Sequence, residues 1–135
     1  MMGGYELFEI DTIPAFRLWG ASRKEVVERA LRALVALRRP DLLLHTTPDV
    51  NIRIHVRGRT FEETLHRFLS AVIFESDYHQ AVFPGVHVIY ADAYEIEGEI
   101  LGIRTDHVEG EIGELFIHRF LFENGRFLIE CRAAI

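Results

Sequence analysis

The stretch YELFEIDTIPAFRLWGASRKEVVERALRALVALRR, residues 5–39, predicts a strand, a turn, a second strand and a long helix. In the second strand Phe16 and Leu18 alternate with amphipathic neighbours, which is the period-two pattern of a half-buried strand. Pro14 lies between the two strands, where a residue without an N–H fits a turn or an edge position.

The helix of this stretch begins with a capping box. Ser22 is expected to accept a hydrogen bond from the backbone N–H of Glu25, whose carboxylate reaches back to the helix start. The apolar residues that follow recur about every 3.6 residues, as on a helix with one buried face: Val27, Ala30, Leu31 and Leu34. The helix must end before Pro40, and the rest of the chain is expected to cover its apolar face.

The middle of the chain predicts a loop, a strand and a second helix. Residues 41–48 are interpreted as a loop that packs its leucines on the core. Residues 50–56 alternate apolar and polar side chains, so this strand has one buried and one solvated face. Thr60 and Glu63 repeat the capping box and open a helix that is expected to end near Glu75.

The second half of the chain is predicted to be mainly strands. Pro84 and Gly85 indicate a turn before a strand at 86–90, and a second strand at 93–103 carries an acidic face. That face is made by three glutamates: Glu95, Glu97 and Glu99. Residues 104–113 are polar and contain glycine, so they are expected to form an exposed loop.

The C-terminal part predicts a β-hairpin. Asn124 and Gly125 favour a type I′ turn, whose two central residues both need positive φ, between strands at Glu114–Glu123 and Arg126–Ile135. Strict alternation divides the apolar residues of the first strand between two faces, with Phe116, Phe120 and Phe122 on one and Leu115, Ile117 and Leu121 on the other. A strand that is apolar on both faces is expected in the middle of a sheet.

These elements predict an α+β fold in which two helices pack on a mainly antiparallel β-sheet. The chain has 135 residues, of which 49% are hydrophobic, and a chain of this size buries enough surface for one core. A single domain over residues 1–135 is therefore expected.

The composition excludes several classes of function. The formal charge of −6 argues against strong direct nucleic-acid binding through net charge. Cys131 is the only cysteine, so an internal disulfide is excluded. The chain lacks an apolar stretch of the roughly 20 residues that span a bilayer and a basic leader, so a cytoplasmic location without membrane association is expected.

A search for catalytic motifs finds none. The seven histidines lack the close spacing that places two imidazoles on one zinc ion. His66 and Ser70 share a helix face, but nothing supplies the third group and the oxyanion site of a serine nucleophile. No glycine-rich phosphate loop is present.

Acidic residues offer the best candidates for a metal site. Glu9 and Asp11 are two residues apart, so on a strand they would point the same way and share a hard cation such as Ca²⁺ or Mg²⁺. Asp106 lies in the loop before the last hairpin and is a further candidate ligand. The alternative is that Glu9 and Asp11 cap a turn.

Basic residues offer a candidate partner-binding surface. Arg53, His55 and Arg57 form a positive stripe on the solvated face of their strand. The stripe is a candidate for binding an acidic partner or a phosphate, and the alternative is an ordinary solvated sheet face.

In the order of its motifs the chain resembles the archease family, small proteins that activate an RNA ligase in tRNA splicing and RNA repair. The resemblance covers nearly the whole chain. It is carried by Trp19-Gly20 at the end of the second strand, the capped helix Glu25-Val26-Val27-Glu28-Arg29-Ala30-Leu31, the second helix Phe61-Glu62-Glu63-Thr64-Leu65 and the closing hairpin.

The departures from the family pattern concern its metal site. Where archeases carry an Asp-His-Thr-Ala-Asp-like run, this chain keeps a carboxylate at Glu9 and has Asp11 in the threonine's place and Ile13 in that of the second aspartate. Ala134 stands where the family has an aspartate near its end, and Phe116 where it has a lysine. Losing charged oxygen ligands removes most of a site's affinity for a hard cation.

The resemblance therefore implies an accessory protein of an RNA ligase, not an enzyme, that holds no cofactor or only a weakly bound divalent cation. The competing hypothesis is an enzyme or small-molecule binding protein with a pocket between helices and sheet. In that hypothesis Asp106, His107 and the Arg53 stripe would lie at the mouth of the pocket. A third hypothesis is a diverged scaffold that serves oligomerisation.

Overall fold

The computed structural model describes residues 4–44, 47–105 and 113–134. Its elements are, in chain order, β1 (Tyr5–Ile10), β2 (Ile13–Gly20), α1 (Arg23–Arg38), the 3₁₀ helix η1 (Pro40–Leu44), β3 (Val50–Arg57), α2 (Phe61–His79), β4 (Ala81–Ala91), β5 (Glu95–Arg104), β6 (Glu114–Glu123) and β7 (Arg126–Ala134).

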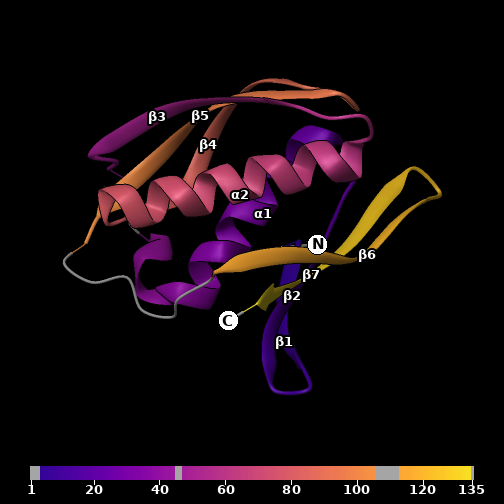
Figure 1. Ribbon diagram of the computed structural model, residues 1–135, viewed down its shortest axis with the longest axis horizontal. Coiled ribbons are helices and arrows are strands. Elements are labelled where there is room, and N and C mark those ends of the chain that lie inside the picture. The colour runs from indigo at the N-terminus through magenta and orange to yellow at the C-terminus, as the bar shows by residue number, and fades with distance from the viewer. Residues whose placement is uncertain (1–3, 45–46, 106–112, 135) are drawn as a thin grey trace.

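The strands form two antiparallel sheets. One has the order β1-β2-β7-β6 and the other the order β3-β5-β4. Both helices lie between the sheets (Figure 1), α1 against β2 and β4 and α2 against β3 and β6. The predicted fold class, two helices packed on antiparallel strands, is confirmed, and the strands are divided between two sheets.

One main hydrophobic core joins both helices to both sheets. Its fully buried side chains come from every layer and include Phe16, Leu31, Phe68, Ile96 and Ile129. Burying a side chain of this size contributes about 1.5–3 kcal/mol. Both helices are therefore packed between the two sheets. No described part of the chain covers the outer face of either sheet.

Both capping boxes form as predicted. Ser22 Oγ accepts a hydrogen bond of 3.2 Å from the Glu25 N–H, and Thr60 Oγ1 accepts one of 3.1 Å from the Glu63 N–H. The second helix continues to His79 and does not end near Glu75.

The extra turn of α2 is stabilised by its contacts with α1 and β4. Ser76 is buried and its hydroxyl donates to the carbonyl of Ala81, while Arg38 binds Asp77 over 2.9 Å. Gln80 then ends the helix with a φ of 49°.

The predicted turn at Pro84 and Gly85 is wrong. Both residues lie inside β4, where the register with β5 shifts between Val82 and Gly85. Strand β4 is at the edge of its sheet and Pro84 lies within this register shift, where a residue without an N–H is tolerated.

The prediction that β6 lies in the middle of a sheet is also wrong, since β6 is an edge strand. Its register with β7 shifts between Ile117 and Arg119, so the side-chain alternation changes there. As a result Phe120 lies on the same side as Ile117, packed against the core. Phe116 faces the other way, with 36% of its surface exposed.

The connection after α1 differs from its prediction, whereas the turn between β6 and β7 confirms its prediction. Residues 40–44 form the helix η1 rather than a loop, and Leu42 is buried against Val35, Val82 and Ile103. The hairpin turn is confirmed, because Asn124 and Gly125 have φ values of 53° and 72°.

Candidate functional site

The turn between β1 and β2 has an unusual backbone. Ile10 pairs with Ile13, so Asp11 and Thr12 are the two central residues of the turn, with φ values of 51° and 68°. Both values lie in the left-handed region, which is costly for a β-branched residue such as Thr12. The Thr12 hydroxyl donates a hydrogen bond of 2.5 Å to the Asp11 carbonyl. The turn is therefore a strained corner that carries a carboxylate.

The structure separates the two predicted metal ligands of this corner. Glu9 lies in β1 opposite Pro14, whereas Asp11 lies in the turn and not on the strand. Strand alternation therefore does not align the two carboxylates, although both side chains are exposed on one hairpin. Asp106 lies outside the described residues.

Within the described ranges no group of three or more His, Cys, Asp or Glu side chains is placed to hold a metal ion. Ca²⁺ takes roughly 6–8 oxygen ligands, and Mg²⁺ needs near-octahedral coordination. The two exposed carboxylates at Glu9 and Asp11 do not by themselves fit either ion.

The end of the chain lies beside this corner. Strand β7 runs antiparallel to β2 with Arg132 opposite Ala15, and it continues to Ala134 (Figure 1). Its last residues therefore run toward Ile13, at the start of β2. The neighbour of Arg132 on the other side is Phe116, whose ring lies 5.0 Å from the Arg132 guanidinium. The arrangement of strands that the resemblance implies is present, with apolar and cationic side chains beside the corner.

The basic stripe lies on the exposed side of β3, opposite acidic residues of β5. Arg53 binds Glu97 at 3.0 Å and His55 binds Glu95 at 2.8 Å, while Arg57 lies 3.8 Å from Glu95. Its charges are thus balanced within the sheet. The sequence showed both the basic and the acidic strand, but it did not show that the two strands are neighbours. Partner binding by the stripe stays a prediction.

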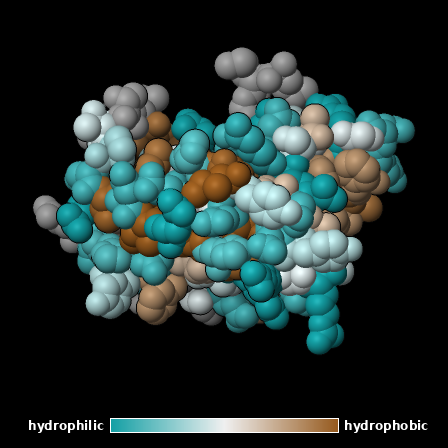
Figure 2. Space-filling view, turned by 90° about the horizontal axis from the view of Figure 1, so that it is seen from above, coloured by the Kyte–Doolittle hydropathy of each residue, from teal (hydrophilic) through white to brown (hydrophobic). Residues whose placement is uncertain are grey.

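Figure 2 views the molecule from the side of the three-stranded sheet. Hydrophilic side chains predominate on this face, and hydrophobic ones form smaller groups between them. This distribution agrees with a sheet face on which opposite charges alternate across the strands.

One cavity between the two helices and the three-stranded sheet is too small for a substrate. It has a volume of about 20 Å³, and Arg38 donates a 3.3 Å hydrogen bond to Ser76 in its wall. Such a volume holds about one water molecule. Arg53 and its stripe lie on the opposite face of their sheet from the helices, because Ile52 and Ile54 of the same strand face the core. The stripe therefore cannot lie at the mouth of this cavity.

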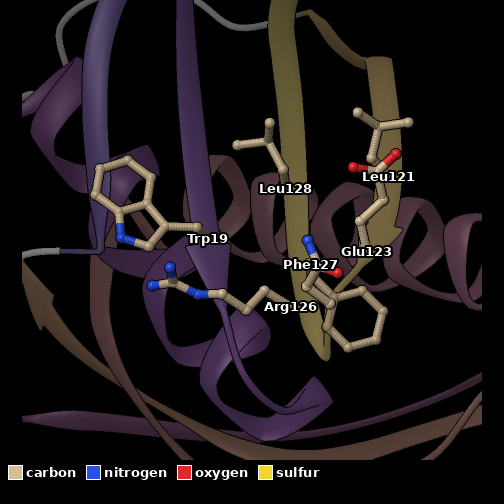
Figure 3. A pocket seen from close by; sticks show the side chains of 7 residues that line it. Trp19, Leu121, Glu123, Arg126, Phe127 and Leu128 are labelled. Carbon is tan, nitrogen blue, oxygen red and sulfur yellow. The ribbon is translucent and has the colours of Figure 1, made fainter.

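A larger hollow, which the sequence did not reveal, lies on the outer face of the four-stranded sheet (Figure 3). It has a volume of about 390 Å³ and is lined by Trp19, Leu121, Glu123, Asn124, Arg126, Phe127 and Leu128. A second open hollow of about 440 Å³ lies between the start of α2 and β6 and is lined by Thr60, Glu62, Glu63, His66, Phe116 and Ile117. Strand alternation predicts which side chains share a face, but only the pairing of β2, β7 and β6 brings these residues together.

The only thiol is not placed for chemistry. Cys131 is buried in β7, and burial raises the pKa of its thiol to about 12. The thiolate is the nucleophilic form, so this residue is inert at neutral pH.

The sequence model of the archease protein family matches residues 5–115. This range contains both helices and the corner at Asp11. The chain belongs to the archease family. No curated protein matches it in sequence.

Solved structures show the same fold. The solution structure of a Methanobacterium thermoautotrophicum protein matches with a TM-score of 0.72 at 20% identity, over 99% of this archease and 100% of that chain. The crystal structure of an archease from Thermotoga maritima, described as a possible chaperone, matches with a TM-score of 0.61 at 12% identity, over 89% of each chain. At these identities the likeness concerns the fold alone. None of the described helices is long and apolar enough to cross a membrane.

Proposed function

We propose that this archease is an accessory protein that assists an RNA ligase in tRNA splicing or RNA repair, in the cytoplasm. The observation that carries the proposal is the family match over residues 5–115. The role is to bind the ligase and promote its guanylylation, so the archease itself breaks and forms no bond.

The second part of the proposal is that metal binding is weakened or lost. Ile13 begins β2 beside the strained turn, at a position where the family resemblance implies an aspartate. A side chain without oxygen atoms cannot offset the dehydration of a hard cation. If Ca²⁺ or Mg²⁺ binds, we expect Glu9 and Asp11 to hold it, with help from Asp106.

Assistance to the ligase is tested with a purified RNA 3′-phosphate ligase and labelled GTP. Adding the archease should raise the rate at which the ligase–guanylate adduct forms and allow repeated turnover of RNA substrate. A heat-unfolded sample of the same archease serves as the control. An unchanged rate at a tenfold molar excess, about the range in which weak partners saturate, would overturn the proposal.

Metal binding is tested by calorimetric titration of the archease alone with Ca²⁺, Mg²⁺ and Mn²⁺. Dissociation constants of about 1 mM or weaker are expected, because exposed carboxylate pairs lack the ligand number of a closed site. The variant Glu9→Gln/Asp11→Asn should remove any residual heat. Micromolar binding by the unmodified protein would contradict this part of the proposal.

A further inference from the structure

The outer face of the four-stranded sheet carries an apolar row that crosses three strands. Trp19 of β2 pairs with Leu128 of β7, and Leu128 pairs in turn with Leu121 of β6. All three side chains are half-buried and line the hollow of about 390 Å³. We call this hollow the Trp19 groove. Figure 3 shows Leu128 between the other two residues of the row.

An arginine without an ion-pair partner stands on each side of this row. Arg126 precedes Leu128 by two residues on β7, and in Figure 3 its side chain extends toward the side of Trp19. Arg119 lies on β6 opposite Glu130, whose carboxylate is already held by Arg17 at 2.7 Å. Both arginines are exposed, and neither forms an ion pair with another residue of the described ranges.

The spacing of these groups defines the chemistry of an occupant. Residues two apart on one strand are about 7 Å apart, so the rows that hold Arg126 and Arg119 are separated by about 13 Å. An extended peptide covers the same distance in four residues. It can therefore place one aliphatic side chain over the apolar row and one carboxylate at each arginine, in the pattern acid-x-aliphatic-x-acid. Arginine holds carboxylates in a bidentate geometry, which makes the match directional.

The charges around the groove favour such a peptide over RNA. Glu123 lines the groove, and Glu6 and Glu130 flank Arg17 in the adjacent row. A continuous phosphate backbone would meet these carboxylates, and the formal net charge of the chain is −6. Glu123 lies opposite Arg126 and Glu130 lies opposite Arg119, so two separate peptide carboxylates would also lie beside glutamates, but each would have an arginine to bind.

The sequence also argues against a second copy of this chain as the occupant. The only two acidic residues of the sequence that are four positions apart are Glu95 and Glu99, and the residue midway between them is Glu97, not an aliphatic residue. The chain therefore contains no acid-x-aliphatic-x-acid segment of its own.

We infer that the Trp19 groove binds an extended segment with the pattern acid-x-aliphatic-x-acid from a partner protein. The aliphatic side chain packs on Trp19, Leu128 and Leu121, and the two carboxylates bind Arg119 and Arg126. This inference rests on the proposed function in one respect, because an accessory protein needs a surface that recognises its partner.

The test uses the only tryptophan of the chain, Trp19, as the reporter. Its indole N–H gives the single side-chain signal of its type in a nitrogen–proton NMR spectrum. The probe is the peptide acetyl-Glu-Ser-Leu-Ser-Glu-amide, titrated to about 10 mM so that weak binding is seen. The chemical shift of the Trp19 indole N–H should change as peptide is added and reach a plateau.

Matched peptides and variants make the test specific. Replacing both peptide glutamates by lysine, or the leucine by serine, should weaken binding by about fivefold or more, since each removes one of the two complementary features. Arg126→Glu and Arg119→Glu should have the same effect. Arg32→Glu, an exposed arginine of α1, is the control that should leave binding unchanged.

Four results would overturn the inference. The first three are the absence of a saturable shift of the Trp19 signal, equal affinity for the lysine peptide, and unchanged peptide affinity in the Arg126→Glu variant. The fourth is a Trp19 shift that is caused only by a single-stranded RNA oligonucleotide or by a higher protein concentration. The experiment contains no ligase. If the peptide does not bind but the archease still stimulates the ligase, the inference about the Trp19 groove is wrong and the proposed function stands. If the peptide binds but the ligase is not stimulated, the proposed function is wrong and the inference about the groove stands.

Discussion

The Nε of Arg17 donates a hydrogen bond of 2.7 Å to Oε2 of Glu130, and this pair joins β2 to β7 at the centre of the four-stranded sheet. Glu130 is only 6% exposed although it lies on the outer face. The Arg17 guanidinium also binds Glu6 and lies 4.7 Å from the Phe8 ring. The hydrogen bond to Glu130 is the main reason that the pKa of Arg17 is raised above its usual value.

Removing the buried partner of this pair should destabilise the fold. Glu130→Ala leaves Arg17 with one exposed carboxylate and should lower the free energy of unfolding by about 1–3 kcal/mol. Glu6→Ala is the matched control, because its side chain is 52% exposed and an exposed pair contributes only about 0.2–1 kcal/mol. Urea denaturation followed by circular dichroism measures both. Equal losses in the two variants would contradict the central role of Glu130.

The buried thiol makes stability fall in alkaline solution. The pKa of Cys131 is about 12 in the folded protein, whereas the pKa of a thiol in an unfolded chain is about 8.5. Because folding raises the pKa of the thiol, its full contribution to the free energy of unfolding is present below about pH 8.5. This contribution is lost as the pH rises toward 12, by up to about 1.4 kcal/mol per pH unit. The difference in unfolding free energy between the unmodified protein and Cys131→Ala should follow this slope. A pH-independent difference would refute it.

The strained turn offers a way to gain stability. Thr12→Gly removes the cost of a β-branched residue at a φ of 68° and should raise the free energy of unfolding by about 0.5–1.5 kcal/mol. Asn124→Gly, at a φ of 53° in the other hairpin, should change it by less than about 0.5 kcal/mol, since asparagine tolerates this conformation. Thermal unfolding of both variants gives the comparison. A destabilised Thr12→Gly variant would show that the hydroxyl bond to Asp11 matters more than the strain.

The sequence predicted the parts of the fold that local chemistry determines. Ser22 and Thr60 cap their helices, and Asn124 and Gly125 form the hairpin turn, because each depends on a few neighbouring residues. Pro84 was misleading because its effect depends on whether its strand lies at an edge, which is a property of the whole sheet. The shift after Ile117 was equally invisible, since a bulge changes the alternation without changing the composition.

In the candidate site, too, the sequence predicted the features that involve neighbouring residues and missed those that depend on strand pairing. Glu9, Asp11 and Ile13 lie within five residues of one another, so the departures from the family pattern at these positions were visible from the sequence. The Trp19 groove was not, because Trp19 and Leu128 are 109 positions apart and meet only through the pairing of β2 with β7. The pairing of Arg53 with Glu97 was hidden in the same way.

A charge swap separates the structural role of the basic stripe from partner binding. Arg53→Glu or Glu97→Arg alone places like charges 3.0 Å apart in the present geometry and should cost about 0.5–1 kcal/mol. The double variant Arg53→Glu/Glu97→Arg restores an opposite pair and should recover most of that loss in urea denaturation. If the stripe also binds the ligase, stimulation of guanylylation will stay low in the double variant. Full recovery of both quantities would assign the stripe to the fold alone.

Restoring carboxylates at the corner should restore metal binding. The variant Ile13→Asp/Ala134→Asp adds two acids at the positions where the family resemblance implies aspartates, one at the start of β2 next to the turn that holds Asp11 and one at the end of β7. With two more carboxylates at this end of the sheet, the affinity for Ca²⁺ should rise by more than about tenfold over the unmodified protein, because the added oxygens offset the dehydration of the ion. Ile13→Asn/Ala134→Asn is the matched control, which has similar shape and no added charge. Calorimetric titration measures all three proteins, and the same weak affinity in each would show that the scaffold at this corner no longer supports a metal site.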